Sequence, residues 1–228
     1  MKIRPLIQDC GAGWNRVIFA AVLFLAAGCA RRYAGRPFPE SGPQKIPGRV
    51  QCEYYDAGGE GIAFHDADSV NSGSGKLNPA DGNPLNEFRM AEAVDISYTK
   101  SGGIDDSGYN RVKPEPASLY VGWTAPGEWL NYTVEVAESG KYRIAMMLTS
   151  NRGGTVAFSI NGRDVTGPVA IRSTFAAADT VAWRQWHHWN CQDSLAEIRL
   201  KKGRQRLTLR TVTEGNMNFD YLDFIPVR

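Results

Sequence analysis

The sequence predicts an all-β fold, a β-sandwich of two antiparallel sheets, and three observations favour it. Short alternating or apolar runs recur between clusters of Gly, Asn and Asp. Beyond Pro47 no stretch carries a helical apolar stripe of useful length. Asn161-Gly162 separates two strand-like runs, and this pair is a strong hairpin signal because both residues tolerate positive φ.

Nine segments have the composition and length of strands, a number typical of sandwiches. In chain order they are residues 49–55, 92–98, 128–136, 140–149, 155–160, 186–191, 195–200, 205–212 and 219–225. The charged residues 201–204 are expected to turn one of these strands back on the next as a second hairpin.

Two long irregular stretches interrupt the strand pattern, residues 58–89 and 100–118. Loops of this length in a compact domain are usually functional or disordered. The first contains aromatic and carboxylate side chains, which favours a function. For the second two interpretations stay open: a wall at one end of a binding site, with Tyr109 as an extra contact, or a mobile insertion.

The N-terminal residues predict export. Residues 17–27 form an eleven-residue apolar run after a basic stretch, too short to span a bilayer and typical of a signal peptide, here predicted as residues 1–28. Cys29 then occupies the position of the acylated cysteine of a bacterial lipoprotein, and the absence of Asp at Ala30 favours the outer membrane or cell surface. The alternative is ordinary cleavage that leaves Cys29 as a free thiol.

The remaining chain divides into residues 29–46, expected to be a flexible tether because they are rich in Pro and Gly, and one module over residues 47–228. The net charge is +2, and this excess lies in the first sixteen residues, so no basic footprint for nucleic acid is left. Cys52 and Cys191 remain for the module, and whether they pair is left open.

Several ordered motifs carry a family resemblance. They are IPGRVQCEYYD at 46–56, GGEGIAFHD at 58–66, FRMAEAVDI at 88–96, VGWTAPGEWLNYTVEV at 121–136 and NFDYLDF at 218–224. Together these motifs resemble a family 6 carbohydrate-binding module or a close relative, over residues 47 to 228. The resemblance implies a jelly-roll sandwich that binds glycans without catalysis and holds a structural calcium ion.

The resemblance places the Ca²⁺ ligands at Gln51, Glu53 and Asp220. Calcium prefers hard oxygen donors, and residues two apart on a strand share a face. Gln51 stands where Glu is common in the family, so the ligand oxygen is kept but one negative charge is lost. The alternative interpretation is that Glu53 and Asp220 are ordinary polar residues at a sheet edge.

For the sugar, the resemblance points to Trp183 as a stacking platform and to Phe88 as the aromatic on the other side of the ring. It also points to Asn218, whose amide can both donate to and accept from sugar hydroxyls. Aromatic faces with a few directional polar groups suit the C–H faces of sugars. Asp66 is a further candidate, although carboxylates in Gly-rich loops are mostly turn formers. For Trp183 the alternative is packing in the core.

The other aromatic and histidine residues are assigned to structure. Trp186 matches a core position of the family, and Trp123, Trp129 and Trp189 alternate within strand patterns and are expected in the core. His187-His188 cannot chelate one ion, because adjacent residues on a strand point to opposite faces.

The chain carries no nucleophile elbow, zinc spacing or phosphate loop. We therefore expect non-catalytic binding of polysaccharide or oligosaccharide at the cell envelope, with a glycan as partner and the membrane contacted through the lipid anchor only. The alternatives are a protein-binding adhesin, an accessory subunit of a glycoside hydrolase, or, more weakly, a glycosidase.

Overall fold

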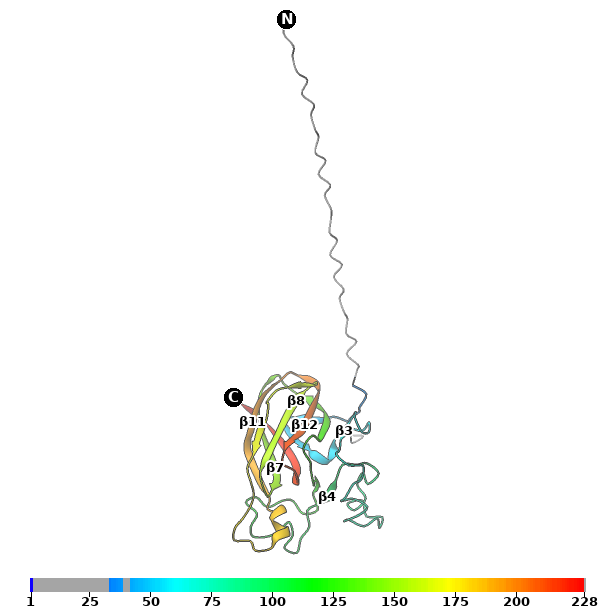
Figure 1. Cartoon of the computed structure of the whole chain (residues 1–228), viewed down its shortest axis with the longest axis vertical. Helices are drawn as coiled ribbons and strands as arrows, with labels where there is room; N and C mark the ends of the chain where they lie inside the picture. Colours follow the sequence, from blue (N-terminus) through cyan, green and yellow to red (C-terminus); the bar gives the residue numbers. More distant parts are fainter. Residues whose placement is uncertain (2–32, 39–41, 228) are drawn as a thin grey trace. The chain divides into compact units, whose positions relative to one another are not determined.

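The computed structural model describes Met1 and residues 33–38 and 42–227, and Tyr33 onward forms one compact unit. The regular secondary structure of this unit is almost entirely β-strand, which confirms the predicted fold class (Figure 1). Its strands are β1 (Gln44–Ile46), β2 (Gly48–Gln51), β3 (Phe64–His65), β4 (Ile96–Tyr98), β5 (Leu119–Val121), β6 (Trp129–Val136), β7 (Gly140–Ser150), β8 (Gly154–Ile160), β9 (Arg163–Asp164), β10 (Val169–Ile171), β11 (Asn190–Leu200), β12 (Gly203–Thr213) and β13 (Met217–Val227). Two short 3₁₀ helices complete it, η1 (Cys52–Tyr54) and η2 (Ala182–Trp186).

In the described part of the chain the strands form two sheets. The first has the order β1-β6-β12-β8-β10, with β3 paired to β6 and β9 to β8. The second has the order β11-β7-β13-β5-β4, with β2 paired to β13. Neighbouring strands pair antiparallel, as expected, except that β1 runs parallel to β6.

One of the two predicted hairpins is confirmed and the other is wrong. Asn161 and Gly162 have φ of 52° and 81°, and they join β8 to β9 with Ile160 opposite Arg163. Residues 201–204 make no hairpin, because β11 pairs with β7 whereas β12 pairs with β6 and β8. The charged segment instead carries the chain from one sheet to the other.

Several strand boundaries also differ from the prediction. The first predicted strand ends at Gln51, where η1 begins, and residues 186–189 precede β11 instead of forming a strand. Residues 190–200 make one continuous strand whose register shifts between Gln192 and Ala196. The short strands β5 and β10 have too few residues to show a periodic pattern.

The expected domain boundary at Pro47 is too late. Residues 44–46 form β1, the side chain of Ile46 is buried, and the Gln44 side chain bonds the backbone of Gln51 and Tyr54. Further upstream, Arg36 and Ala57 exchange backbone hydrogen bonds. The described end of the predicted tether is therefore part of the folded module, whereas the predicted signal peptide and Cys29 lie outside the described residues, apart from Met1.

The main core lies between the sheets. On β12, Leu207 and Leu209 alternate with polar residues and pack with Phe158, Phe219 and other apolar side chains of both sheets. Cys52 and Cys191 are both free thiols. Among the described residues, no helix is long and apolar enough to cross a membrane.

A second apolar cluster lies on the other face of the second sheet. It contains Tyr120, Met147 and Trp189, and the register places Met147 opposite both Cys191 and Tyr221 on the neighbouring strands. The 100–118 loop packs against this cluster: the backbone NH groups of Arg111 and Val112 both donate to the carbonyl of Trp189. These hydrogen bonds anchor the loop to the cluster.

Candidate functional site

One pocket gathers aromatic and polar side chains from four parts of the chain. It has a volume of about 240 Å³ and lies where β5, η2 and the start of β13 meet. Its lining residues are Tyr120, Trp123, Trp183, Trp186, His187, Asn216 and Asn218. We refer to it as the tryptophan pocket. Trp183 and Asn218, two of the residues expected to bind sugar, lie in it together.

The local backbone explains why two tryptophans line this pocket. Trp183 and Trp186 are three residues apart on η2, and a 3₁₀ helix has three residues per turn, so both side chains leave the same side of it. Trp183 is 54% exposed, which leaves a large aromatic surface free. Its ring meets the ring of His187 edge-on, with 5.9 Å between centroids.

Trp123 reaches the pocket from the loop between β5 and β6. Its φ of 46° is unusual for a bulky residue, and the next residue fixes this loop to the start of β13. The Thr124 hydroxyl donates to the Met217 carbonyl and accepts from the Met217 NH, while the Asn216 NH donates to the Thr124 carbonyl. These bonds hold the loop that carries Trp123 against the segment that carries Asn216.

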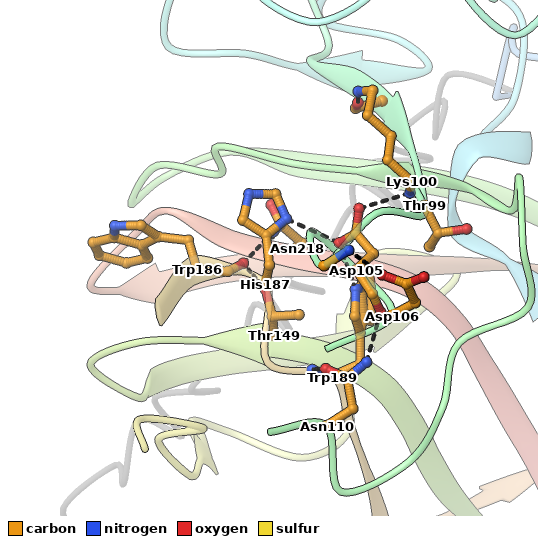
Figure 2. A network of polar contacts seen from close by, with 12 residues as sticks. Thr99, Lys100, Asp105, Asp106, Asn110, Thr149, Trp186, His187, Trp189 and Asn218 are labelled. Carbon is orange, nitrogen blue, oxygen red and sulfur yellow. Dashed lines mark hydrogen bonds and ion pairs between the residues drawn. The ribbon is translucent and has the colours of Figure 1, made fainter. Parts of the chain in front are cut away.

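Asn218 offers the pocket an acceptor and no free donor. Its Nδ2 donates to the Thr149 hydroxyl and to the Trp186 carbonyl, each at 2.9 Å. The Thr149 hydroxyl itself donates to the same carbonyl at 2.7 Å, so its oxygen has to accept from the amide, which fixes the amide orientation. Only Oδ1 of Asn218 is then left for a ligand, whereas the sequence led us to expect both functions. Figure 2 shows this network.

His187 belongs to the same network and was assigned to structure by the sequence. Its Nδ1 lies 2.9 Å from Oδ1 of the buried Asp105, which comes from the 100–118 loop. The same oxygen accepts from the indole NH of Trp189 at 2.7 Å, and Oδ2 accepts from the Lys100 NH at 2.8 Å (Figure 2). His188 points elsewhere, with its Nε2 2.8 Å from Asp179.

The other expected sugar contacts lie apart from the tryptophan pocket. Phe88 packs in an aromatic cluster, with ring centroids 5.7 Å from Phe38 and 5.9 Å from Tyr54. Phe88 is therefore not among the residues that line the pocket with Trp183, which corrects the expected pairing of these two side chains.

Asp66 and Tyr109 are also placed elsewhere. Asp66 lies beside His65, Glu128 and Trp129 around a separate, smaller hollow. Tyr109 donates its hydroxyl to the Ala178 carbonyl, and its ring packs against His188 at 5.5 Å. The 100–118 loop therefore reaches the pocket wall through Asp105 and not through Tyr109.

The expected core tryptophans have three different environments. Trp189 is fully buried, as expected, but in the cluster under the 100–118 loop. Trp129 is only partly buried and faces His65, whereas Trp123 lines the pocket. Two signals in the sequence could have indicated the pocket residues: the three-residue spacing of Trp183 and Trp186, and the turn-forming residues Gly, Pro and Gly around Trp123.

The expected calcium ligands lie on neighbouring elements, Gln51 on β2 opposite Tyr221 of β13, Glu53 on η1 and Asp220 on β13, and we call their side-chain oxygens the buried oxygen group. Gln51 Oε1 and Glu53 Oε2 are buried without a hydrogen-bond partner among the described residues. Asp220 accepts from the Ser118 hydroxyl at 2.9 Å. Burial raises the pKa of Glu53 to about 8, with a contribution from Asp220, and burial raises the pKa of Asp220 to about 6.

The group has two carboxylates and one amide, and the described residues contain no metal-binding arrangement of three or more His, Cys, Asp or Glu side chains. The proposed set differs from such arrangements because its third ligand, Gln51, is an amide. The two partnerless oxygens are the kind of donor that a hard cation takes, and a nearby positive charge would offset the cost of burying both carboxylates.

Comparison with known proteins agrees with this architecture. The family model "Carbohydrate binding module (family 6)" matches residues 95–226, which is more than half of the chain. A comparison with curated proteins finds no match.

Solved structures that match this chain include a carbohydrate binding module from Cellvibrio mixtus lichenase 5A in complex with cellotriose, at 21% identity and a TM-score of 0.41, covering 59% of this chain and 91% of that one. A β-1,3-glucan binding module from Bacillus halodurans has 14% identity and a TM-score of 0.47, covering 80% and 98%. A Clostridium stercorarium module in complex with cellobiose has 11% identity and a TM-score of 0.46, covering 82% and 98%. Since the family model accounts for most of the sandwich, the chain belongs to family 6 of the carbohydrate binding modules.

Proposed function

We propose that this protein binds a polysaccharide or oligosaccharide without catalysis, and that the tryptophan pocket is the binding site. The observation that carries the proposal is the convergence of three tryptophans with Asn218 and His187 on one open pocket. Aromatic faces pack on the C–H faces of sugar rings, and the polar atoms orient the hydroxyls. Membership of the family supports the same function.

The chemistry of the lining residues supports binding over hydrolysis. A glycosidase needs two carboxyl groups flanking the scissile bond. The described residues that line the pocket contribute indole, phenol, imidazole and amide groups but no carboxylate. With one or two stacked rings, a single site should bind with a Kd of roughly millimolar to micromolar.

The test is glycan binding by Trp183→Ala, measured by calorimetry or affinity electrophoresis. We expect binding to be lost while the melting temperature changes little, because Trp183 is largely exposed. Phe175→Ala is the matched control, since Phe175 is 50% exposed and lies outside the pocket lining. Undiminished binding by Trp183→Ala would refute the site, and release of reducing ends by the pure protein would refute the non-catalytic role.

The buried oxygen group supports a second proposal, that Gln51, Glu53 and Asp220 hold a structural Ca²⁺ ion. Gln51 lies on β2, Glu53 on η1 and Asp220 on β13, so these residues would tie the start of the module to its last strand. The ion would supply a positive charge among oxygens that are otherwise costly to bury. The ion would act as a structural clamp, and the tryptophan pocket would contact the sugar.

We also propose that residues 1–28 are a signal peptide and that Cys29 is acylated, which would hold the module at the cell envelope, at the outer membrane or cell surface. The support is the apolar run before Cys29 in the sequence. Incorporation of labelled palmitate that disappears in Cys29→Ala tests this. A glycoside hydrolase that acts on the same glycan stays a predicted partner, and its capture would depend on the same envelope location.

A further inference from the structure

We propose that His187 is a sugar-contacting acceptor in the tryptophan pocket and that Asp105 of the 100–118 loop is the positioning residue that sets its tautomer. This inference rests on the proposed glycan-binding function and names two residues that determine its specificity. It follows from the network drawn in Figure 2.

The hydrogen bond with Asp105 determines which ring nitrogen of His187 carries the proton. An ionised carboxylate only accepts hydrogen bonds, and Asp105 Oδ1 already accepts from the indole NH of Trp189, which can only donate. The Nδ1 of His187, at 2.9 Å from the same oxygen, must therefore carry a hydrogen. In the neutral imidazole, Nε2 is then a bare acceptor; His187 lines the pocket, and among the described residues its ring makes a hydrogen bond through Nδ1 alone.

Asp105 is itself held rigidly, so the position of the imidazole is set before a ligand arrives. Its side chain is 1% exposed, and its Oδ2 accepts from the Lys100 NH. The amide of Asn110 donates to the Asp105 carbonyl at 2.6 Å and accepts from the Trp189 NH at 3.0 Å. The loop thus connects the buried Trp189 to the pocket wall. The entropy cost of ordering the His187 side chain is therefore incurred on folding and not on ligand binding.

Two acceptors then define the ligand that the pocket takes. Asn218 Oδ1 and His187 Nε2 both need a donor, and sugar hydroxyls can donate to both. The carboxylate of a uronate or a sulfate group offers only acceptor oxygens, and the described lining residues include no lysine or arginine to bind it. The site should prefer an uncharged sugar over the corresponding anionic sugar.

The first experiment needs no ligand. Nitrogen-15 NMR of the full module at pH 8 should show His187 with a protonated Nδ1 and an unprotonated Nε2. Asp105→Ala removes the acceptor and should let His187 populate the other tautomer, whereas Asp106→Ala, at the exposed neighbouring position, should not. A wild-type His187 protonated at Nε2 would overturn the inference.

The second experiment measures binding to cellohexaose, xylohexaose and laminarihexaose as neutral probes and to an oligogalacturonate as the anionic probe. His187→Phe keeps an aromatic ring but removes the acceptor, so the Kd for the neutral probe that the wild type binds best should rise about tenfold, or about 1.4 kcal/mol. Asp105→Ala should weaken binding in the same direction. His187→Phe keeps the inference testable if Asp105→Ala does not fold.

The outcomes separate this inference from the proposed function. If Trp183→Ala abolishes binding while His187→Phe stays within twofold of the wild type, the glycan site stands and the role of His187 is overturned. Tighter binding of the oligogalacturonate than of every neutral probe also overturns it. If the wild type binds none of these glycans, the proposed function fails and this inference fails with it.

Discussion

Glu128, in the turn before β6, has a carboxyl group with a raised pKa. Its two carboxylate oxygens accept from the backbone NH groups of Ala67 and Ala125, and Asp66 and Asp95 lie close by. Burial, and then the charges of Asp66 and Asp95, raise the pKa of Glu128 to about 7. Burial likewise raises the pKa of Asp95 to about 6, with help from Asp66.

These shifts predict that the module is less stable at pH 8 than at pH 5. A carboxyl group whose pKa is higher in the folded than in the unfolded protein binds more protons when folded, so the unfolding free energy falls as the pH rises from about 4.5 to about 7. Thermal melting in saturating Ca²⁺ should show this fall, and Glu128→Gln should show a smaller one. Glu138→Gln, at an exposed turn, is the control, and equal pH profiles for wild type and Glu128→Gln would contradict the prediction.

Single residues of the site were predictable only where a sequence motif specified them. Trp183 and Asn218 were identified in this way and lie in the same pocket. His187 and Trp186 were missed because the strand expected there is replaced by the 3₁₀ helix η2, which changes the direction of each side chain. The free functions of Asn218 were misjudged because its hydrogen-bond partners, Thr149 and Trp186, come from distant parts of the chain.

At the scale of elements, strands with a local signal were predicted and their partners were not. Alternation identified the long strands β6, β7, β8, β12 and β13, because side-chain period depends only on neighbouring residues. The sheet in which β11 and β12 lie depends on contacts far along the chain, so the 201–204 segment resembled a hairpin and is a crossover. β1 was missed because three residues after a Pro-rich stretch carry no periodicity.

The edge strand β1 predicts that the module requires residues before Pro47. A chain that begins at residue 47 should be less stable than one that begins at residue 42, because it loses the pairing with β6, the burial of Ile46 and the Gln44 bonds to Gln51. Ile46→Ala alone should cost about 2–5 kcal/mol of unfolding free energy. Chemical denaturation measures both, with Lys45→Ala at the exposed position of β1 as control. Equal stability of the two chains would restore the tether interpretation.

For the molecule as a whole, the proposed calcium ion should act mainly on stability. A ligand that binds only the folded state at about 100 times its Kd adds about 2.7 kcal/mol. For a domain of this size we expect a chelator to lower the melting temperature by about 5–10 °C, with a smaller effect on glycan affinity at room temperature. Gln51→Glu restores the missing charge and should raise calcium affinity, whereas Glu138→Gln, at an exposed position away from the proposed ligands, should not change it. Superimposable melting curves with and without chelator would exclude the ion.

The combination of a weak site with a proposed lipid anchor predicts that retention of a polymer depends on surface density. Copies fixed to one membrane can bind one polysaccharide together, and effective concentrations on the order of millimolar raise retention without any new contact. The chain from residue 29 onward, coupled through Cys29 to supported bilayers in a Cys191→Ser background, should release a long glycan more slowly as its density increases. A trisaccharide of the same sugar should leave at one rate at every density, and a Trp183→Ala surface should retain neither. If the polymer dissociates at a density-independent rate, the anchor provides location but no gain in avidity.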